Sequence, residues 1–542
     1  MKFSLAAFLF DAKRFFSVAF AFLFSFLLYA SPVTPGQGAG TSIHSTVRGS
    51  LYPSTIKIMQ KQLLDNSKAI DMHLAKNERE ACQLVLKTKN IKNNLEWDMT
   101  AFSNGNGNTL ECKVFKESYI NVSTTDTPLY YPDAIVPFAG GKFSVDHANV
   151  SQPFYIQVAS GAQTPAGNYT ATISIKDNDD GGKTECTFTI TAVVWNFTLP
   201  VTPSCETAMG LEKGQIAAKH GVAGNSAEAT ELYKKYYEFL LSHKISAYNL
   251  PVDILSDEAD AYMSDPRVTS FCIPYSGSDE QLVKYYAKVN SNPVWAAKGF
   301  FYPIDEPSTA EAYATYCQMT DRLARLCPGY HMVTPFNTYK FTSAGKDFNS
   351  VEQQKGKSDI MCCISNLYDE DGFARQVAER VANGDKSWWY VCCGPKGDYC
   401  NIFTHWEGIQ HRLLFWQQKQ NKVTGLLYWS TSYWADVKDV WTQALTTPWT
   451  GKESFGDGSL LYNGNKVGID GPVSSLRLEA VTDGIDDYEY LTMAGKLFGE
   501  DYVSDTIAKV SSSMTKYTYS DKLFDSVRTQ LGNDISNYYA AN

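Results

Sequence analysis

The sequence lacks several features that mark common functional classes. It has no run of Lys or Arg, and its formal net charge is -10 with a pI of about 5.4. An acidic surface repels phosphate backbones, so we expect no nucleic-acid partner. The chain also has no CxxC motif, and its Cys and His spacing matches no zinc site.

The chain has 12 cysteines, but we do not expect most of them to form disulfide bonds. Two adjacent pairs, Cys362-Cys363 and Cys392-Cys393, lie in apolar, strand-like runs. Neighbouring residues of a strand face opposite sides, so we expect that neither pair forms one bridge. A free cysteine behaves as a small buried hydrophobe. The sequence therefore favours mostly free core thiols.

After the first 30 residues, no further apolar run is long enough to cross a membrane. At the N-terminus, Lys13 and Arg14 precede an apolar run over 15–30 and then Ser31-Pro32. This pattern favours a signal peptide over 1–30, with a retained anchor as the alternative. A linker at 31–44 would follow. We expect an exported protein that is periplasmic, on the cell surface or extracellular, with N-terminal membrane association if the anchor is kept. The sequence leaves the oligomeric state open.

Residues 45–200 show short alternating runs of apolar and polar residues. Turn signals at 104–107 and 177–182 separate these runs. Alternation with a period of two and such turns predicts an antiparallel β-sandwich domain. The clearest runs are 81–87, 153–158, 167–176 and 186–194.

From residue 201 onward, apolar runs of strand length alternate with amphipathic helical stretches. Eight such alternations predict a (β/α)8 TIM barrel over 201–500, and the fold class is an α+β multidomain protein. A helical tail over 501–542 is expected to pack on the barrel. The expected strands are 205–210, 245–250, 269–274, 299–304, 331–336, 359–365, 387–394 and 425–430. The clearest expected helices are 227–243, 278–291, 309–326, 372–383, 404–421, 477–497 and 521–539.

Asp305 and Glu306 follow the fourth expected strand of the barrel. In parallel barrels the functional groups sit at the carboxyl ends of the strands. A helix cap could explain an acidic residue here, but Ser308 has the form of an N-cap within a capping box. An ion pair with a basic residue of a neighbouring loop is the other structural explanation. Two close carboxylates repel one another, so one should titrate high, which suits a general acid.

Glycoside hydrolysis commonly uses two carboxyl groups. Adjacent residues of a regular strand point to opposite faces, so both reach one cavity only if the strand ends there. Pro307 makes such a break plausible because it keeps Glu306 out of helical geometry. Substrate-assisted chemistry fits an adjacent pair, since the 2-acetamido oxygen of the substrate is then the nucleophile.

Motifs along the whole chain resemble glycoside hydrolase family 123 and the related family of domain of unknown function 4091. The N-terminal part carries KNEREACQLVL at 76–86, TPAGNYT at 164–170 and VWNFTLP at 194–200. The later part carries IDEP at 304–307, WWYVCCGP at 388–395, GLLYWS at 425–430, GDGSLLY at 456–462, SLRLE at 475–479 and DGIDDYEY at 483–490.

The resemblance implies an exo-acting, retaining β-N-acetylgalactosaminidase with no metal and no other cofactor. Its substrate would be a glycan or glycolipid that ends in β-linked N-acetylgalactosamine. Asp305 would orient the acetamide and stabilise the oxazolinium intermediate. Glu306 would be the general acid and then the base that activates water.

Other polar and aromatic residues at the expected strand ends are candidates for sugar binding. Each also has a structural explanation, such as core packing for the aromatic residues and turn formation for the Asn residues and the Gly-Asp-Gly turn. Tyr390 could donate to the acetamide carbonyl, and Trp429 could stack on the sugar. The remaining candidates are Trp388, Tyr428, Asn337, Tyr368, Asn366 and Asp457.

Two other functions remain open from the sequence. One is hydrolysis of another β-glycoside on the same scaffold. The other is an exported carbohydrate-binding protein without turnover, which the intact Asp305-Glu306 pair disfavours because a binding module does not need two adjacent carboxylates. By contrast, Arg477, Glu479, Asp483 and Asp487 are expected to pair with one another or with neighbours for structural reasons.

Overall fold

The computed structural model describes residues 46–125, 127–435, 437–444 and 453–542. All of them fall within one compact unit, Ser45–Asn542. The expected signal peptide at 1–30 and the linker at 31–44 lie outside the described residues. Among the helices that are described, none has the length and apolarity needed to cross a membrane.

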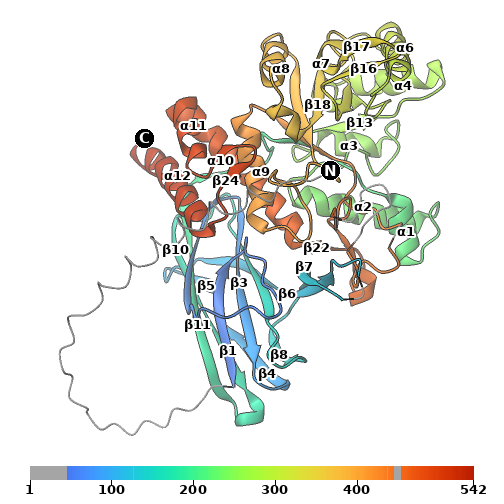
Figure 1. Cartoon of the computed structure of the whole chain (residues 1–542). Helices are drawn as coiled ribbons and strands as arrows, with labels where there is room; N and C mark the ends of the chain where they lie inside the picture. Colours follow the sequence, from blue (N-terminus) through green and yellow to red (C-terminus); the bar gives the residue numbers. More distant parts are fainter. Residues whose placement is uncertain (1–45, 126, 436, 445–452) are drawn as a thin grey trace, which may run out of the picture. The chain divides into compact units, whose positions relative to one another are not determined.

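The N-terminal part is a β-rich region, blue to green in Figure 1. Its main hydrogen-bonded path runs β1-β3-β9-β6-β5-β10-β11-β2, and β7, β4 and β8 join it from the side. Every pair is antiparallel except β2 with β11. The strands are β1 Val47–Pro53, β2 Ala69–Lys76, β3 Arg79–Thr88, β4 Lys92–Met99, β5 Phe102–Ser103, β6 Thr109–Asn121, β7 Tyr130–Pro137, β8 Gly141–Val145, β9 Gln152–Ala159, β10 Gly167–Asp177 and β11 Lys183–Thr198.

Alternating burial explains why these segments are strands. In β10 the buried apolar residues are Tyr169, Ala171, Ile173 and Ile175, while the residues between them are less buried. This period of two places one face of the strand in an apolar cluster with Phe154 and other large side chains. The four runs named from the sequence all lie inside observed strands.

The second part is a mixed α/β region built around a near-barrel of parallel segments. Five strands form one parallel sheet in the order β12-β20-β19-β18-β15. The strands are β12 Glu206–Met209, β13 Phe271–Ile273, β14 Gly299–Phe301, β15 Val333–Phe336, β18 Ile360–Ile364, β19 Lys386–Tyr390 and β20 Gly425–Tyr428.

Single bridges and hydrogen bonds continue this sheet on its other side. Met209 bridges Ala247, and the Cys272 amide donates to the Tyr248 carbonyl at 2.6 Å. Strands β13 and β14 pair in parallel, and Phe301 bridges Met332 beside β15. Each expected barrel strand therefore has a counterpart here, although the segment at 245–250 is represented only by a bridge.

The interior of the near-barrel is filled by side chains rather than left open. One hydrophobic cluster fills this interior, and each of the seven strands and the segment at 245–250 contributes at least one side chain to it or packs one against it. Its members are Ala208, Phe300, Val333, Ile360, Cys362, Trp388, Tyr390 and Leu427, with Tyr248, Cys272, Tyr302, Ile364 and Cys392 packed against them.

Helices follow most of these strands and bury apolar stripes against the outside of the sheet. In α6, for example, Tyr313, Tyr316, Thr320 and Leu323 are buried at helical spacing. The helices are α1 Lys213–His220, α2 Ala227–Ser242, α3 Glu258–Ser264, α4 Asp279–Asn290, α5 Pro293–Lys298, α6 Ala310–Leu326, α7 Ser350–Gln353, α8 Phe373–Ala382 and α9 Gly408–Gln420. Two short hairpins complete this part, β16 Lys340–Ser343 with β17 Lys346–Asn349 and β23 Ser511–Ser513 with β24 Lys516–Tyr517.

The chain then returns to the β-rich region. Strand β21 (Tyr462–Asn463) pairs with β22 (Pro472–Ser475), and β22 also pairs with β7 of the N-terminal part. Three helices follow, red in Figure 1: α10 Leu476–Phe498, α11 Glu500–Ala508 and α12 Asp521–Ala541. Helix α12 contacts β11, β2 and α10, so the C-terminal helix packs largely on the β-rich region.

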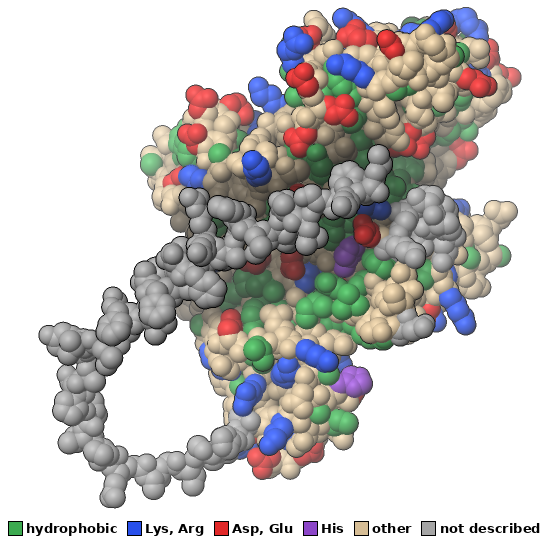
Figure 2. Space-filling view, in the orientation of Figure 1, with side chains coloured by type: hydrophobic (Ala, Val, Ile, Leu, Met, Phe, Trp, Pro, Cys, Tyr) green, Lys and Arg blue, Asp and Glu red, His purple; other side chains and the backbone are tan. Residues whose placement is uncertain are grey.

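The molecular surface carries both signs of charge. On the face seen in Figure 2, Lys and Arg side chains are interspersed with Asp and Glu side chains. All 12 cysteines are free, as expected. Cys362 and Cys363 enter different clusters, as strand alternation requires. Cys392 and Cys393 follow the end of β19, and there the prediction of opposite faces is wrong: their sulfurs contact each other at 3.8 Å.

Candidate active site

Asp305 and Glu306 lie just beyond the carboxyl end of β14, separated from it by Tyr302, Pro303 and Ile304. Parallel strands end at a common edge, so the residues after the other segments meet this pair there. Asp305 is exposed, whereas Glu306 is half-buried.

The backbone at Glu306 explains how adjacent side chains reach the same place. Its φ is 41°, a left-handed conformation that L-residues rarely adopt. Pro307 follows it, so the chain leaves strand geometry at this point. The conformation costs roughly 1–2 kcal/mol for a residue with a side chain, and such strain tends to persist at functional sites.

The helix after this pair is capped by a different residue from the one expected. Ser308 was the expected N-cap, but α6 begins at Ala310 and its N-cap is Thr309. The Thr309 hydroxyl accepts from the Ala312 amide at 3.1 Å. The capping-box prediction is therefore wrong by one residue, but its consequence stands: this cap uses neither Asp305 nor Glu306.

Glu306 is held by two donors from neighbouring strand ends. Tyr390, the last residue of β19, donates its hydroxyl to Oε1, and Asn337, directly after β15, donates its side-chain amide to Oε2 at 2.7 Å. Burial raises the pKa of Glu306, and the negative charge of Asp305 raises it further. The two hydrogen bonds lower the pKa but do not reverse the shift. A carboxyl group with a raised pKa is suited to donate a proton near neutral pH.

Among the described residues, Asp305 has a hydrogen-bond partner in Tyr302. The Tyr302 hydroxyl donates to its Oδ1 at 2.7 Å. Tyr302 packs against the interior cluster and its ring contacts that of Tyr248 at 6.3 Å. Burial and the Asp305 charge raise the pKa of Tyr302, so this hydroxyl stays protonated and remains a donor. Tyr302 therefore orients the Asp305 carboxylate over the end of the near-barrel.

Asp457 lies beside the end of β20. Its Oδ1 accepts from the Trp429 indole N–H at 3.0 Å and from the Tyr428 hydroxyl at 3.2 Å. Burial raises the pKa of Asp457 to about 6, against the opposing effect of these donors. Its other oxygen, Oδ2, is buried and has no hydrogen-bond partner among the residues that the structure describes. That oxygen is suited to accept a hydrogen bond from a bound molecule.

The loop that carries Asp457 fits closely on Trp429. Gly458 has a φ of 73°, and a Cβ there would lie 2.1 Å from the Trp429 ring. Only glycine can occupy this position without displacing the ring. Trp429 is half-buried and its ring also contacts that of Tyr433 at 5.1 Å. The indole is thus fixed in place at the edge.

Arg477 of α10 holds the same loop in place through hydrogen bonds to its backbone carbonyls. It donates to the Gly456 carbonyl at 2.8 Å and to the Ser459 carbonyl at 2.5 Å. Its guanidinium also pairs with Asp133 of β7 at 2.8 Å, and both side chains are fully buried. A strand of the β-rich region thereby supports the position of Asp457.

The other sequence candidates lie at different depths. Asn366 follows β18, and its amide oxygen is buried without a partner among the described residues. Trp388 points into the interior near the amino end of the strands, where its indole donates to Glu206 at 2.8 Å. Tyr368 donates to or accepts from Ser387 and packs on Phe373, outside the near-barrel. The structure therefore brings Tyr390, Asn337, Trp429 and Asp457 to the edge, places Tyr428 beneath Asp457, and leaves Trp388 and Tyr368 away from the acidic pair.

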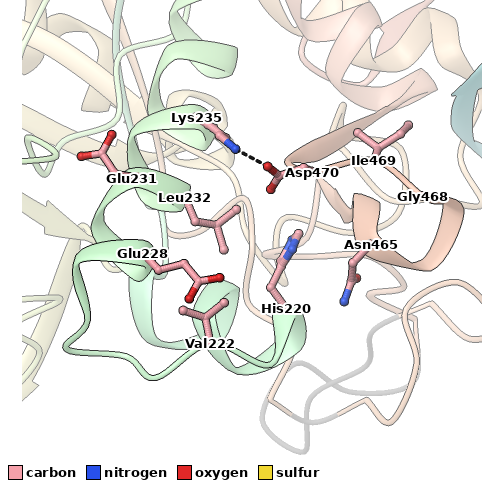
Figure 3. A pocket seen from close by; sticks show the side chains of 10 residues that line it. All are labelled: His220, Val222, Glu228, Glu231, Leu232, Lys235, Asn465, Gly468, Ile469 and Asp470. Carbon is pink, nitrogen blue, oxygen red and sulfur yellow. Dashed lines mark hydrogen bonds and ion pairs between the residues drawn. The ribbon is translucent and has the colours of Figure 1, made fainter.

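Two of the hollows lined by described residues of the α/β part lie apart from the acidic pair. One of about 630 Å³ opens where the chain leaves β12 and the segment at 245–248, and Glu212 and Asn249 are among its lining residues. The other, of about 400 Å³, lies between α1, α2 and residues 465–470 (Figure 3). There Lys235 pairs with Asp470, as the dashed line in Figure 3 marks. Neither Asp305 nor Glu306 lines these hollows.

Two contributors to the site were not identified from the sequence. Tyr302 lies three residues before Asp305 in the same motif, and its position at a strand end could have indicated it. The Tyr248 hydroxyl donates to the Trp429 carbonyl at 3.2 Å. This contact joins segments that are far apart in the sequence, so no local pattern predicts it.

A family model now adds independent information on this region. Residues 274–494 match the model described as glycoside hydrolase 123, catalytic domain. The match includes Asp305, Glu306, Tyr390, Trp429 and Asp457. The sequence matches no curated protein at a significant level.

One solved structure supports the fold. It is a family 123 glycoside hydrolase from Clostridium perfringens, whose structural analysis concerned the hydrolysis of glycolipid glycans. It superposes on this chain with a TM-score of 0.66 at 15% sequence identity, and the match covers 91% of this chain and 98% of that one. An FMN-binding beta-glucuronidase from Facaelibacterium prausnitzii L2-6 gives a TM-score of only 0.30 at 9% identity, over 82% and 61% of the two chains. Residues 274–494 of this chain therefore belong to glycoside hydrolase family 123 as its catalytic domain, and the protein is a glycoside hydrolase.

Proposed function

We propose that this protein is an exo-acting, retaining β-N-acetylgalactosaminidase that works by substrate assistance. Its substrate would be a glycan or glycolipid with a terminal β-linked N-acetylgalactosamine. The observation that carries the proposal is the Asp305-Glu306 pair, in which Glu306 is half-buried with a raised pKa and Asp305 is exposed and oriented by Tyr302.

In the first step the 2-acetamido oxygen of the substrate attacks the anomeric carbon. Asp305 accepts the acetamide N–H and stabilises the positive charge that develops on the oxazolinium ring. Glu306, which burial and Asp305 keep protonated to higher pH, gives its proton to the leaving oxygen. No protein atom has to bond to the sugar, so the carboxylates need not have the spacing of a protein nucleophile and its acid.

In the second step Glu306, now ionised, takes a proton from water. The water attacks the anomeric carbon from the side that the aglycone has left, and the β configuration is retained. The Tyr390 hydroxyl and the Asn337 amide stabilise this ionised form, because both donate to the Glu306 carboxylate. The same two donors therefore assist the base step at some cost to the acid step.

We assign sugar contacts to groups at the edge that have spare hydrogen-bonding capacity. Asp457 Oδ2 and the Asn366 amide oxygen can each accept from a hydroxyl. The Trp429 ring, fixed by Asp457 and Gly458, can stack on the apolar face of the sugar or enclose the acetamide methyl. Tyr390 could turn from Glu306 to the acetamide carbonyl when substrate is present.

We also propose that the protein is exported, on the basis of residues 13–36 alone. This proposal fits an enzyme that acts on glycans or glycolipids outside the cell.

A comparison of aryl glycosides that differ at C2 and C4 tests the function. We expect cleavage of an aryl N-acetyl-β-galactosaminide, and cleavage of the matching β-galactoside that is at least about a thousandfold slower, because the intramolecular nucleophile is then missing. A thiazoline mimic of the oxazolinium should inhibit competitively. If the β-galactoside is cleaved and the N-acetyl compound is not, the mechanism is wrong and another β-glycoside is the substrate.

A further inference from the structure

Cys392 and Cys393 follow Tyr390, the residue that donates to Glu306. Both thiols are free and half-buried, and their sulfur atoms lie 3.8 Å apart. Strand alternation would have separated them, but β19 ends at Tyr390 and the chain turns after it. The pair is thus a half-buried dithiol at the edge that holds the candidate active site.

The backbone of this pair is fixed on both sides. The Cys392 carbonyl accepts from the Asn401 side chain at 3.0 Å, and the Cys392 amide donates to the Gly394 carbonyl at 2.7 Å. The Cys393 carbonyl accepts from the Ser454 hydroxyl at 3.4 Å. Ser454 belongs to the loop that also carries Asp457. These contacts hold the backbone from which the two thiol side chains project.

The distance between the two sulfurs distinguishes two reactions of a thiol pair. A disulfide needs the sulfurs about 2.05 Å apart, so closure would move them together by almost 2 Å against these backbone contacts. A tetrahedral soft metal ion bonded to both sulfurs at about 2.3 Å holds them about 3.8 Å apart, and pyramidal trivalent arsenic, with narrower bond angles, holds them somewhat closer. The observed distance of 3.8 Å is therefore much nearer to the second case than to a disulfide.

We propose that Cys392 and Cys393 form a binding site for one thiophilic atom, such as trivalent arsenic or a soft metal ion, bridged between the two sulfurs. Reaction with an arylarsine oxide illustrates the balance. Two S–As bonds form, the As=O oxygen leaves as water with the two thiol protons, and arsenic stays trivalent. The reaction needs no oxidant or reductant.

The electrostatics of the pair favour such a reaction. The contact between the sulfurs lowers the pKa of Cys393 and raises that of Cys392. The thiolate is the form that bonds to soft atoms. Lys396 lowers the pKa of Cys393, while Asp457 and Glu306 raise it. The effects of Asp457 and Glu306 on this pKa also show that the cysteine pair lies near these two carboxyl groups.

Intact-mass measurement on the folded full chain with phenylarsine oxide tests the proposal. We expect one phenylarsenic group that resists excess monothiol and is released by a dithiol, because chelation by two sulfurs outlasts single thiol bonds. Cys392→Ser and Cys393→Ser should each abolish the resistant adduct. Cys186→Ser, which removes a lone half-buried thiol of β11, should retain it.

Peptide mapping of the wild-type adduct gives an answer that does not depend on how the variants fold. The arsenic should be on the peptide that contains residues 392 and 393. Failure of the wild type to form a resistant adduct, or its persistence in either Ser variant, would overturn the proposal. So would untreated protein in which this peptide is lighter by two hydrogens, since the pair would then close on itself.

Discussion

At the residue scale, the division of labour between Asp305 and Glu306 can be tested by changing each to its amide. Glu306→Gln should lower kcat for substrates with poor leaving groups by about 10²–10⁴-fold, because no acid then protonates the leaving oxygen. An activated aryl glycoside should be affected less, since its leaving group departs without protonation. Asp305→Asn should impair both kinds of substrate, because oxazolinium formation precedes either departure.

Steady-state kinetics on one activated and one unactivated N-acetyl-β-galactosaminide provide the measurement. Asn337→Gln, which changes a donor to Glu306, is a useful comparison because it leaves both carboxylates intact. Wild-type rates in either amide variant would refute the assigned roles.

The local motif was sufficient to predict the position of the acidic pair after a strand, but not the positions of all its neighbours. Asp305, Glu306 and Tyr390 could be placed because each comes at or just after an apolar strand in a parallel arrangement. Trp388 precedes Tyr390 by two and shares its face, as alternation predicted, yet it lies at the other end of the interior near Glu206. Depth along a strand depends on where its neighbours begin, and sequence periodicity carries no information about that.

At the scale of elements, β7 and α10 meet at the Asp133–Arg477 pair. Asp133→Asn should leave Arg477 undercompensated and loosen the loop that carries Asp457. If Asp457 binds the sugar, KM should rise about tenfold while kcat stays within about threefold, the pattern of lost uniform binding.

The control for this variant is Asp98→Asn. Asp98 belongs to β4 of the same region and pairs with Lys176 at the surface. Its loss should leave both kinetic constants unchanged. An Asp133→Asn protein that is folded and has wild-type KM would show that the pair does not position the loop.

A buried residue of strand β6, Glu117, allows a test of how the stability of the protein depends on pH. Glu117 is fully buried, and both of its carboxylate oxygens lack hydrogen-bond partners among the described residues. Burial raises its pKa to about 8; Lys57 lowers it and Asp133 raises it. A raised pKa in the folded state means that stability is fully present below about pH 4.5 and is lost as pH rises through 8.

Glu117→Gln removes this titration. Its melting temperature should exceed that of the wild type by about 2–4 °C at pH 8 and approach it at pH 4.5. Glu111→Gln, on an exposed part of the same strand, should show no such difference. Equal melting of Glu117→Gln and wild type at both pH values would contradict a buried, protonated Glu117.

Element positions were largely predictable because hydrophobic periodicity is local. Helix α2 was expected at 227–243 and is found at Ala227–Ser242, and β20 was expected at 425–430 and is found at Gly425–Tyr428. The segment at 245–250 is the exception, since it contributes a bridge rather than a strand. Its pairing depends on neighbours in the ring and not on its own pattern.

On the scale of the whole molecule, buried charges join the β-rich and α/β parts. Arg412 of α9 pairs with Glu80 of β3 at 2.9 Å and with Asp487 of α10 at 2.7 Å, and all three are buried. The sequence suggested structural pairing for Asp487 and Arg477. It could not identify partners such as Asp133, 344 residues before Arg477, because no periodicity links them.

Arg412→Leu should therefore destabilise the protein by about 3–5 kcal/mol, because it leaves carboxylates buried without their partner. Denaturant unfolding measures the change. Arg267→Leu, which breaks partly exposed pairs with Asp265 and Glu238, should cost less than about 1 kcal/mol. Similar losses in the two variants would contradict the interpretation that burial of the charges makes Arg412 critical.

The pairing of β22 with β7 has a consequence for synthesis on the ribosome. Strand β7 ends at Pro137, and β22, which completes its edge, ends at Ser475. At about 5–20 residues per second, β7 is made roughly 20–70 s before its partner strand. During that interval one edge of β7 has no strand to pair with, and such an edge can recruit other chains. Slow translation of residues 138–475 should therefore increase aggregation of nascent chains, and a chaperone that covers sheet edges should reduce it.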